Sequence, residues 1–593
     1  MKKSLFALCI IMLLGACKKE SNKNNGLAVD LPPINDVFES YYQQSLKLNP
    51  INATFTGDNK YNDKLPNNIT KDYRETALNV FQTYKDSLAL YEDEFLNEEE
   101  KLSKAVLLWE LNQNIENLKF KTYLMPVNQF SSMHLMIGQL GSGSSAQPFK
   151  TPADYNNWLS RLEKFSTWVD SAVVNMKQGI KEGYIIPKTL IVKTIPQFTD
   201  LTKTPIDENL FYSPVKIIPD HFSEEEKKRL TESYTHTISE KVIPSMKKMD
   251  DFLKNEYLNA GRKTSGINDI PEGKELYNAL IRLYTTTNLT ADEIHKLGLS
   301  EVARIRSEME KVKKEVGYKG DLISFFDYVR NKKELMPFTE PRQVIDNFNA
   351  IHEKMKPNLE KLFDLTPKTA FEVRRTEAFR EVSASAEYNQ GSLDGTRPGI
   401  FYVPIPDVTT YNIYSDEDLF LHEAIPGHHY QISLQQENTK LPDFRKTLWY
   451  SAYGEGWALY TEALGKELGL YEDPYQYFGM LSAEMHRAIR LVVDTGLHAK
   501  GWTREQAIQY SLDNEAESEA SITAEIERYM AIPGQALSYK IGQLKILELR
   551  AKAEKALGEQ FSIKEYHNKV LESGCIPLQL LENKIDTWIA SKK

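Results

Sequence analysis

Three histidines and a glutamate stand close together in the segment LHEAIPGHHYQ, residues 421–431. Glu423 directly follows His422, and His428 and His429 come six and seven residues after the first histidine. Zinc is bound by histidine nitrogens and carboxylate oxygens at ~2.0–2.2 Å. In a helical H-E-x-x-H segment, two histidines share one face and the glutamate acts as a general base. The residue types here fit a zinc site, but the spacing does not.

The residues between the histidines could interrupt the helix and so bring the histidines together despite their spacing. On an unbroken helix, six residues turn His428 away from His422, and seven place His429 ~10 Å further along the axis. Pro426 interrupts helical hydrogen bonding, and Gly427 adds backbone freedom, including positive φ. We therefore expect a bulge that brings His428, or alternatively His429, opposite His422. The other interpretation is a helix that ends at Pro426, with surface histidines in a turn.

A candidate third ligand lies in YGEGWALYTE, residues 453–462. Glu455 comes 33 residues after His422 (455 minus 422), and Glu462 follows seven residues later on a segment rich in aromatic residues. A carboxylate buried in such a helix needs a partner, and a zinc ion would be one. Alternatively, Glu455 faces solvent or pairs with an arginine.

The rest of the chain predicts a mainly α fold with a small β element near the site. Apolar residues recur at spacings of three and four over most of residues 36–274, which indicates buried helix faces. Residues 383–410 are instead rich in Gly, Pro and β-forming residues, and Ile400–Val403 is typical of a short strand. Ser415 and Asp418 have the spacing of a capping box that would open the helix with the histidines.

Four segments together resemble the DUF885 family of bacterial proteins, which carry H-E-x-x-P-G-H-H, G-E-G-W-A, R-L-V-x-D-T-G-x-H and P-G-Q-A-x-x-Y. They stand here at residues 422–429, 454–458, 490–498 and 533–539. The first two also resemble motifs of the gluzincin metallopeptidases, including the M1, M2, M3 and M32 families. The resemblance to DUF885 covers nearly the whole mature chain and implies a helical peptidase-like fold with zinc peptidase activity. It implies three zinc ligands and one catalytic base, namely His422, His428 (with His429 as the alternative), Glu455 and, as the base, Glu423.

Other residues could complete such a site. A zinc peptidase must stabilise an oxyanion, commonly with a Tyr or His donor, and Tyr529, Tyr539 and His498 are the candidates. Each of the three could instead be structural. Glu462 and Asp494 are candidate partners that orient the ligands, although Asp494 could equally form an ion pair within its helix.

The predicted strand supplies candidate substrate-binding residues. An extended peptide can pair with a strand edge, so we expect Ile400–Val403, including Tyr402, to bind substrate. Arg397, just before the strand, could hold a substrate carboxylate through two hydrogen bonds. Alternatively, Arg397 ties down its own loop.

The N-terminus predicts export and a lipid anchor. Two lysines, an apolar run and Leu-Gly-Ala before Cys17 are typical of a signal peptide over residues 1–16. The arrangement resembles a bacterial lipoprotein signal, which implies cleavage before Cys17 and lipid attachment to it. An ordinary secretory signal is the alternative. We expect residues 17–33 to form a polar tether. The apolar run is shorter than the ~20 residues that span a bilayer. Lys18, where inner-membrane lipoproteins carry Asp, favours the outer membrane.

Composition narrows the function further. The 593 residues carry a formal net charge of −10 without a basic tail, which argues against nucleic acid as a partner. We expect one catalytic region over residues 34–593, with a helical half at about 34–274 and a zinc-site half at about 275–593. The predicted protein is a membrane-anchored zinc metallopeptidase acting on short peptides. Its rivals are a zinc hydrolase of a non-peptide amide or ester and an inactive binding lipoprotein.

Overall fold

The computed structural model describes residues 31–143, 145–377, 381, 384–392, 395 and 397–593. Cys17, the predicted signal peptide and most of the tether lie outside these residues. Helices dominate the described chain and strands form one small sheet, so the predicted mainly α fold is confirmed. None of the described helices combines the length and the apolar character that crossing a membrane requires.

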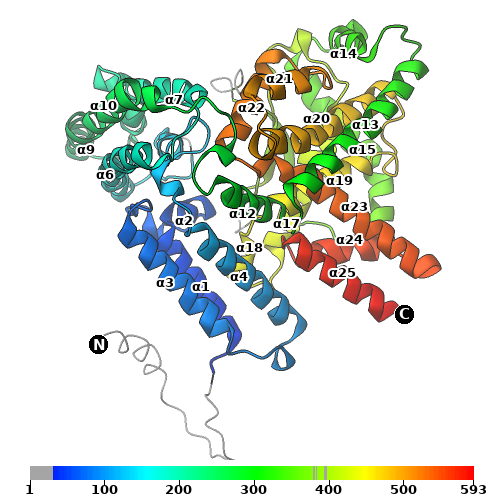
Figure 1. The fold of residues 1–593 in the computed structure, drawn as a ribbon, viewed down its shortest axis with the longest axis horizontal. Helices are drawn as coiled ribbons and strands as arrows, with labels where there is room; N and C mark the ends of the chain where they lie inside the picture. Colours follow the sequence, from blue (N-terminus) through cyan, green and yellow to red (C-terminus); the bar gives the residue numbers. More distant parts are fainter. Residues whose placement is uncertain (1–30, 144, 378–380, 382–383, 393–394, 396) are drawn as a thin grey trace, which may run out of the picture.

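The helices before residue 261, which belong to the first part of the chain, lie on the left of Figure 1. Their bounds are α1 (Ile34–Leu48), α2 (Pro50–Thr56), α3 (Lys71–Leu88), α4 (Glu98–Asn117), α5 (Met133–Leu140), α6 (Pro152–Glu182), α7 (Lys188–Asp200), α8 (Ser213–Lys216), α9 (Glu224–Thr237), α10 (Ile243–Phe252) and α11 (Leu258–Ala260). Prolines and hydroxyl or amide side chains start several of them. At the start of α6, the Thr151 side chain accepts from Asp154 N, and the Asp154 side chain accepts from Thr151 N, which forms a capping box.

The later helices fill the centre and right of Figure 1 and include those that carry the histidine and glutamate motifs. Their bounds are α12 (Gly273–Thr285), α13 (Ala291–Glu315), α14 (Leu322–Asn331), α15 (Pro341–Leu362), α16 (Asp416–Glu423), α17 (His428–Glu437), α18 (Asp443–Lys446), α19 (Ser451–Ala463), α20 (Pro474–Ala499), α21 (Arg504–Leu512), α22 (Glu519–Ala531), α23 (Ser538–Leu557), α24 (Ile563–Leu571) and α25 (Leu578–Lys592).

The two parts of the chain share one hydrophobic core. A continuous cluster of buried apolar side chains runs from Ile34 in α1 to Ile589 in α25. Polar contacts also join the parts: Gln129 Nε2 donates to the Glu527 carbonyl at 3.0 Å, and the fully buried Arg445 donates to Ser103 Oγ at 3.0 Å. Burial on this scale stabilises the chain through removal of apolar surface from water.

The sheet lies between α15 and α16 in sequence and has the order β1-β3-β2. Strand β1 (Phe371–Arg375) is parallel to β3 (Gly399–Val403), and β2 (Glu387–Asn389) is antiparallel to it. The predicted strand at residues 400–403 is confirmed as part of β3. Its predicted role in edge pairing is wrong, because β1 and β2 occupy both of its edges.

The helix with the histidines differs from the prediction at both ends. Ser415 precedes α16, but its side chain caps no backbone N–H, so the predicted capping box does not form. Asp418 is instead buried within the protein. At the other end, α16 stops at Glu423 and α17 starts at His428, so residues 424–427 form a break between two helices rather than a bulge within one.

Candidate metal centre

The break between α16 and α17 is held by close backbone packing. Gly427 has φ −74°, so positive φ is not what requires glycine here. A Cβ at this position would lie 2.0 Å from the His422 carbonyl oxygen and 2.2 Å from that of Leu421. Only glycine lets the start of α17 fold back against the end of α16. The preceding Ile425–Pro426 peptide bond is cis.

Helix α19 fixes the same break from its side. Trp457 Nε1 donates to the Pro426 carbonyl at 2.8 Å, and Thr461 Oγ1 donates to the Leu421 carbonyl at 2.8 Å. Helix α19 itself lies against α23, where a Cβ on Gly456 would come within 2.4 Å of Gly542 Cα. The glycines and the tryptophan of GEGWA thus set the position of the glutamate between them.

These elements bring His422, His428 and Glu455 together. One ligand atom from each lies within 4.8 Å of the other two. Glu455 Oε2 is 3.6 Å from His422 Nε2 and 3.4 Å from His428 Nε2. Ligands at ~2.1 Å around a tetrahedral ion lie about 3.4 Å from one another, so these atoms fit a divalent cation such as Zn²⁺. The three side chains are only 6%, 11% and 15% exposed, in the order named above.

A second glutamate orients the first histidine. The ring of His422 donates from Nδ1 to Glu462 Oε1 at 2.6 Å, which leaves Nε2 directed at Glu455. Burial disfavours the charged ring, but Glu455 and Glu462 outweigh it and raise the pKa of His422 to about 10. Burial also acts against the Glu455 carboxylate, yet His428 and His422 hold its pKa well below the usual range. Glu455 and Glu462 thus lie at the two nitrogens of the His422 ring.

The carboxylate of Glu423 lies beside these ligands at the end of α16. It accepts a hydrogen bond from the backbone N–H of Tyr388 in β2 at 2.9 Å. Burial raises the pKa of Glu423, and the positive charge of His422 and His428 opposes that shift. A raised pKa brings a carboxylate closer to the range in which a general base works at neutral pH.

The neighbouring histidine faces the other way. His429 Nδ1 hydrogen-bonds with the Tyr388 hydroxyl at 3.0 Å, and its ring packs on Phe371 of β1 with centroids 4.8 Å apart. Burial lowers the pKa of His429 to about 4. The structure thus brings His428, and not His429, to His422 and Glu455.

Two of the proposed oxyanion donors lie around Arg490. Its Nε donates to the Tyr529 hydroxyl at 2.9 Å, and that hydroxyl donates to Glu525 at 2.7 Å. The Arg490 guanidinium also lies over the Tyr539 ring, 4.6 Å from its centroid. Burial and the Glu455 carboxylate raise the pKa of Tyr539.

His498 and Asp494 serve the packing of α20. His498 accepts from Ile267 N at 2.9 Å and donates from Nε2 to the Tyr529 carbonyl at 3.1 Å, so both ring nitrogens have backbone partners. Asp494 accepts from the Tyr277 hydroxyl at 2.6 Å and from Gly534 N at 3.1 Å. Its described hydrogen bonds thus lead neither to a metal ligand nor to an ion pair within the helix.

The candidate substrate-binding residues lie on and before β3. Arg397 is exposed, and its backbone N–H donates to Ser392 Oγ at 2.9 Å. Burial raises the pKa of Tyr388, and the positive charge of Arg397 opposes that rise. Tyr402 is 8% exposed in the central strand. Neither position is an open strand edge.

Two residues that sequence reasoning missed adjoin the site. Asp418 lies four residues before His422 and hence on the same face of α16, a spacing that could have revealed it. It is buried, and burial together with Glu462 raises its pKa well above the usual range. Trp449 lies with its ring 5.7 Å from that of His428. No sequence motif pointed to it.

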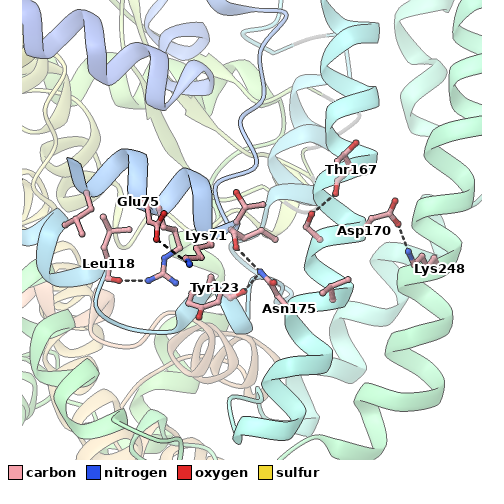
Figure 2. Close-up of a pocket in the computed structure, with 14 residues that line it drawn as sticks. Lys71, Glu75, Leu118, Tyr123, Thr167, Asp170, Asn175 and Lys248 are labelled. Atoms are coloured by element: carbon pink, nitrogen blue, oxygen red, sulfur yellow. Dashed lines mark hydrogen bonds and ion pairs between the residues drawn. The ribbon is translucent and has the colours of Figure 1, made fainter. Parts of the chain in front are cut away.

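Figure 2 shows a separate cavity of about 780 Å³ in the first part of the chain, lined mainly by α3 and α6. Its polar groups already pair with one another. Arg74 donates to the carbonyls of Leu118 and Phe120, and Lys248 pairs with Asp170 at 2.9 Å. The candidate metal ligands do not line this cavity.

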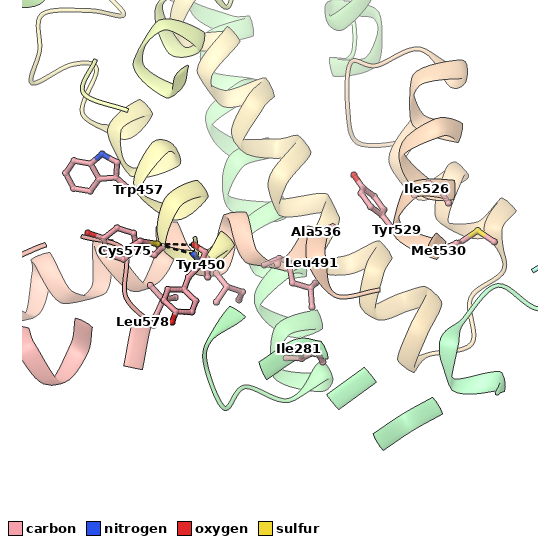
Figure 3. Close-up of a cluster of buried hydrophobic side chains, with 14 of the residues drawn as sticks. Ile281, Tyr450, Trp457, Leu491, Ile526, Tyr529, Met530, Ala536, Cys575 and Leu578 are labelled. Atoms are coloured by element: carbon pink, nitrogen blue, oxygen red, sulfur yellow. Dashed lines mark hydrogen bonds between the residues drawn. The ribbon is translucent and has the colours of Figure 1, made fainter. Parts of the chain in front are cut away.

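Part of the hydrophobic core adjoins α19. Tyr450 and Trp457, before and within α19, belong to the buried cluster that Figure 3 shows, together with Cys575. The Cys575 sulfur accepts from Tyr450 N at 3.1 Å, and burial raises the pKa of its thiol to about 12. A thiol in that state is a packing group rather than a nucleophile.

Comparison with known proteins identifies the chain by family. A solved structure from Colwellia psychrerythraea, described as a "putative lipoprotein", is 28% identical with a TM-score of 0.84, over 94% of this chain and 99% of that one. A second "putative lipoprotein of unknown function", from Shewanella oneidensis, is 17% identical with a TM-score of 0.76, over 93% and 99%. The curated proteins contain no match. The profile of the family described as "Bacterial protein of unknown function (DUF885)" matches residues 50–585, so the chain belongs to the DUF885 family.

Proposed function

We propose that the protein is a zinc-dependent peptidase held at the cell envelope by lipid on Cys17. The observation that carries this proposal is the cluster of His422, His428 and Glu455, with the separations expected of ligands around one tetrahedral ion. The resemblance to gluzincin motifs and the lipoprotein description of the structural neighbours add support. We favour short peptides as substrates and the outer membrane as the location.

The donor set suits Zn²⁺, since two imidazoles and one carboxylate are typical of catalytic zinc sites. A bound zinc ion would polarise a substrate carbonyl and lower the pKa of a coordinated water to about 7. Glu462 holds His422 in the tautomer that offers Nε2. The separations of Glu455 Oε2 from His422 Nε2 and His428 Nε2, 3.6 and 3.4 Å, support this choice.

We assign the proton transfers to Glu423. Its carboxylate takes a proton from the attacking water and delivers it to the leaving amine. The hydrogen bond from Tyr388 N fixes one carboxylate oxygen and directs the outer edge of β2 towards the same place. An extended peptide would then pair with β2 rather than with the central β3. We assign oxyanion stabilisation to Tyr539, because the Tyr529 hydroxyl is bonded to Arg490 and Glu525 and both His498 ring nitrogens have backbone partners.

The test starts with metal content and ends with hydrolysis. We expect purified wild-type protein to hold about one zinc per chain and the His422→Ala variant to hold almost none, by elemental analysis. Glu423→Gln should keep its zinc and lose ~10²–10⁴-fold in the hydrolysis of short fluorogenic peptides. Equally little zinc in wild type and His422→Ala would refute the metal site. Unchanged hydrolysis in Glu423→Gln would refute the assigned base.

A further inference from the structure

Trp449 is an exposed aromatic residue at the candidate metal centre. Its side chain is 44% exposed, although its ring centroid lies 5.7 Å from that of the proposed ligand His428. The two rings are inclined at 59°. A solvent-exposed indole beside the buried His428 is an apolar surface that another apolar group can cover.

The exposure of Trp449 does not come from a loose chain. On one side of it, the Leu448 carbonyl accepts from Gln435 Nε2 at 2.9 Å. On the other side, Tyr450 N donates to the buried Cys575 sulfur at 3.1 Å. The backbone is therefore fixed immediately before and after the tryptophan.

Helix α19 also provides a seat for the indole ring. A Cβ on Gly454 would lie 2.1 Å from Cη2 of Trp449 and 2.4 Å from Cζ3. The missing side chain at Gly454 thus lets the ring lie directly on the helix that carries Glu455. The indole is held between this helix and His428, with its remaining surface open to solvent.

We propose that Trp449 binds a bulky apolar side chain next to the scissile bond, so that the preferred substrates are peptides with Phe, Tyr, Trp or Leu at that position. The inference rests on the proposed peptidase function. A peptide whose carbonyl lies at the metal has its flanking side chains within a few ångströms of the ligands, which is where the indole lies. Stacking on the indole and removal of its open surface from water would favour an apolar side chain over a polar one.

A different role for Trp449 predicts a different result. If the ring only shields His428 from water, its removal should weaken metal binding and change the hydrolysis of all peptides alike. If it binds a substrate side chain, its removal should act on peptides with an apolar flanking residue and spare those with a polar one. The ratio of kcat/KM between two such peptides therefore separates the roles.

The experiment compares two fluorogenic peptides that differ only in a Phe or a Ser beside the cleaved bond. We expect wild type to favour the Phe peptide by ~10–100-fold in kcat/KM, as the burial of one aromatic side chain allows. Trp449→Ala should lose most of that preference at unchanged zinc content, and Trp449→Phe should keep part of it. Phe95→Ala, which removes an aromatic residue that is 79% exposed, is the matched control and should behave as wild type.

Equilibrium binding separates this inference from the proposed function. Zinc-loaded Glu423→Gln should bind the Phe peptide more tightly than the Ser peptide, by calorimetry, and the added Trp449→Ala change should remove the difference. Hydrolysis of both peptides at equal kcat/KM, or an equal loss for both in Trp449→Ala, would overturn the inference and leave the peptidase function standing. A wild type that neither holds zinc nor cleaves either peptide would overturn both.

Discussion

The Glu462 carboxylate accepts a hydrogen bond from Nδ1 of His422 at 2.6 Å, while Nε2 of the same ring lies 3.6 Å from Glu455. Both glutamates come from α19, seven residues apart, so one helix supplies a proposed ligand and the group that orients another. This contact fixes which nitrogen faces the metal position.

Glu462→Gln should lower the zinc affinity ~10–100-fold, as the loss of a charged partner behind a ligand histidine typically does. The amide can still accept the Nδ1–H bond, so we expect the fold to be kept. Competition with a chelator measures the affinity, and Glu467→Gln, at a glutamate paired with Arg550 near the surface, is the control. Equal affinity in Glu462→Gln and wild type would contradict the assigned role.

Replacement of His428 and replacement of His429 should affect the bound zinc differently. His428→Ala removes a proposed ligand, so we expect bound zinc to fall to the level of His422→Ala. His429→Ala removes a ring that packs on Phe371 and bonds with Tyr388, so it should lower the melting temperature but keep the zinc. Elemental analysis beside a thermal melt reads both. Zinc loss in His429→Ala alone would exchange the roles of the two residues.

Gly427→Ala should disrupt the metal centre through the backbone. The added Cβ would meet the carbonyls of Leu421 and His422, which cannot move without shifting α16. We expect at least a tenfold loss of zinc affinity and a loss of stability of ~1–3 kcal/mol. Gly501→Ala, which has φ +70° and open space around it, should destabilise by ~1–2 kcal/mol without affecting zinc. Normal zinc binding by Gly427→Ala would refute this account of the break.

Asp494 should make stability fall as pH rises. Burial raises its pKa from 3.8 to about 7, although Tyr277 and Gly534 donate to the carboxylate. Between these values the folded chain keeps a proton that the unfolded chain has lost, so this contribution to stability is lost as pH rises through about 7. Asp494→Asn cannot ionise and keeps an acceptor oxygen.

Urea unfolding of both proteins at about pH 5 and about pH 7.5 tests this expectation. The free energy of unfolding of Asp494→Asn, relative to wild type, should rise by on the order of 2 kcal/mol between the two conditions. Parallel pH dependence of the two proteins would show that Asp494 does not titrate in this range.

The sequence carried enough local information to predict the helical fold class and the strand at residues 400–403, since hydrophobic periodicity and β-forming residues act over short distances. It did not reveal that β3 is the central strand, because its neighbours β1 and β2 are separate segments whose pairing depends on tertiary contacts. The capping box at Ser415 failed for a related reason. Asp418 is drawn into the interior beside Glu462, and no local rule contains that partner.

Residue types, together with the resemblance to DUF885 and gluzincin motifs, singled out His422, Glu423 and Glu455 in the sequence. For Glu455 the physical reason was that a carboxylate on a helix rich in aromatic residues needs a partner when buried. The sequence could not settle whether His428 or His429 is the second ligand, since the two are adjacent and differ only in the direction of their side chains. Tertiary structure made that choice: Gly427 packs on the His422 carbonyl, and α19 holds the break through Trp457. The direction of a side chain after a break depends on what the break packs against, and that contact lies some thirty residues away in the chain.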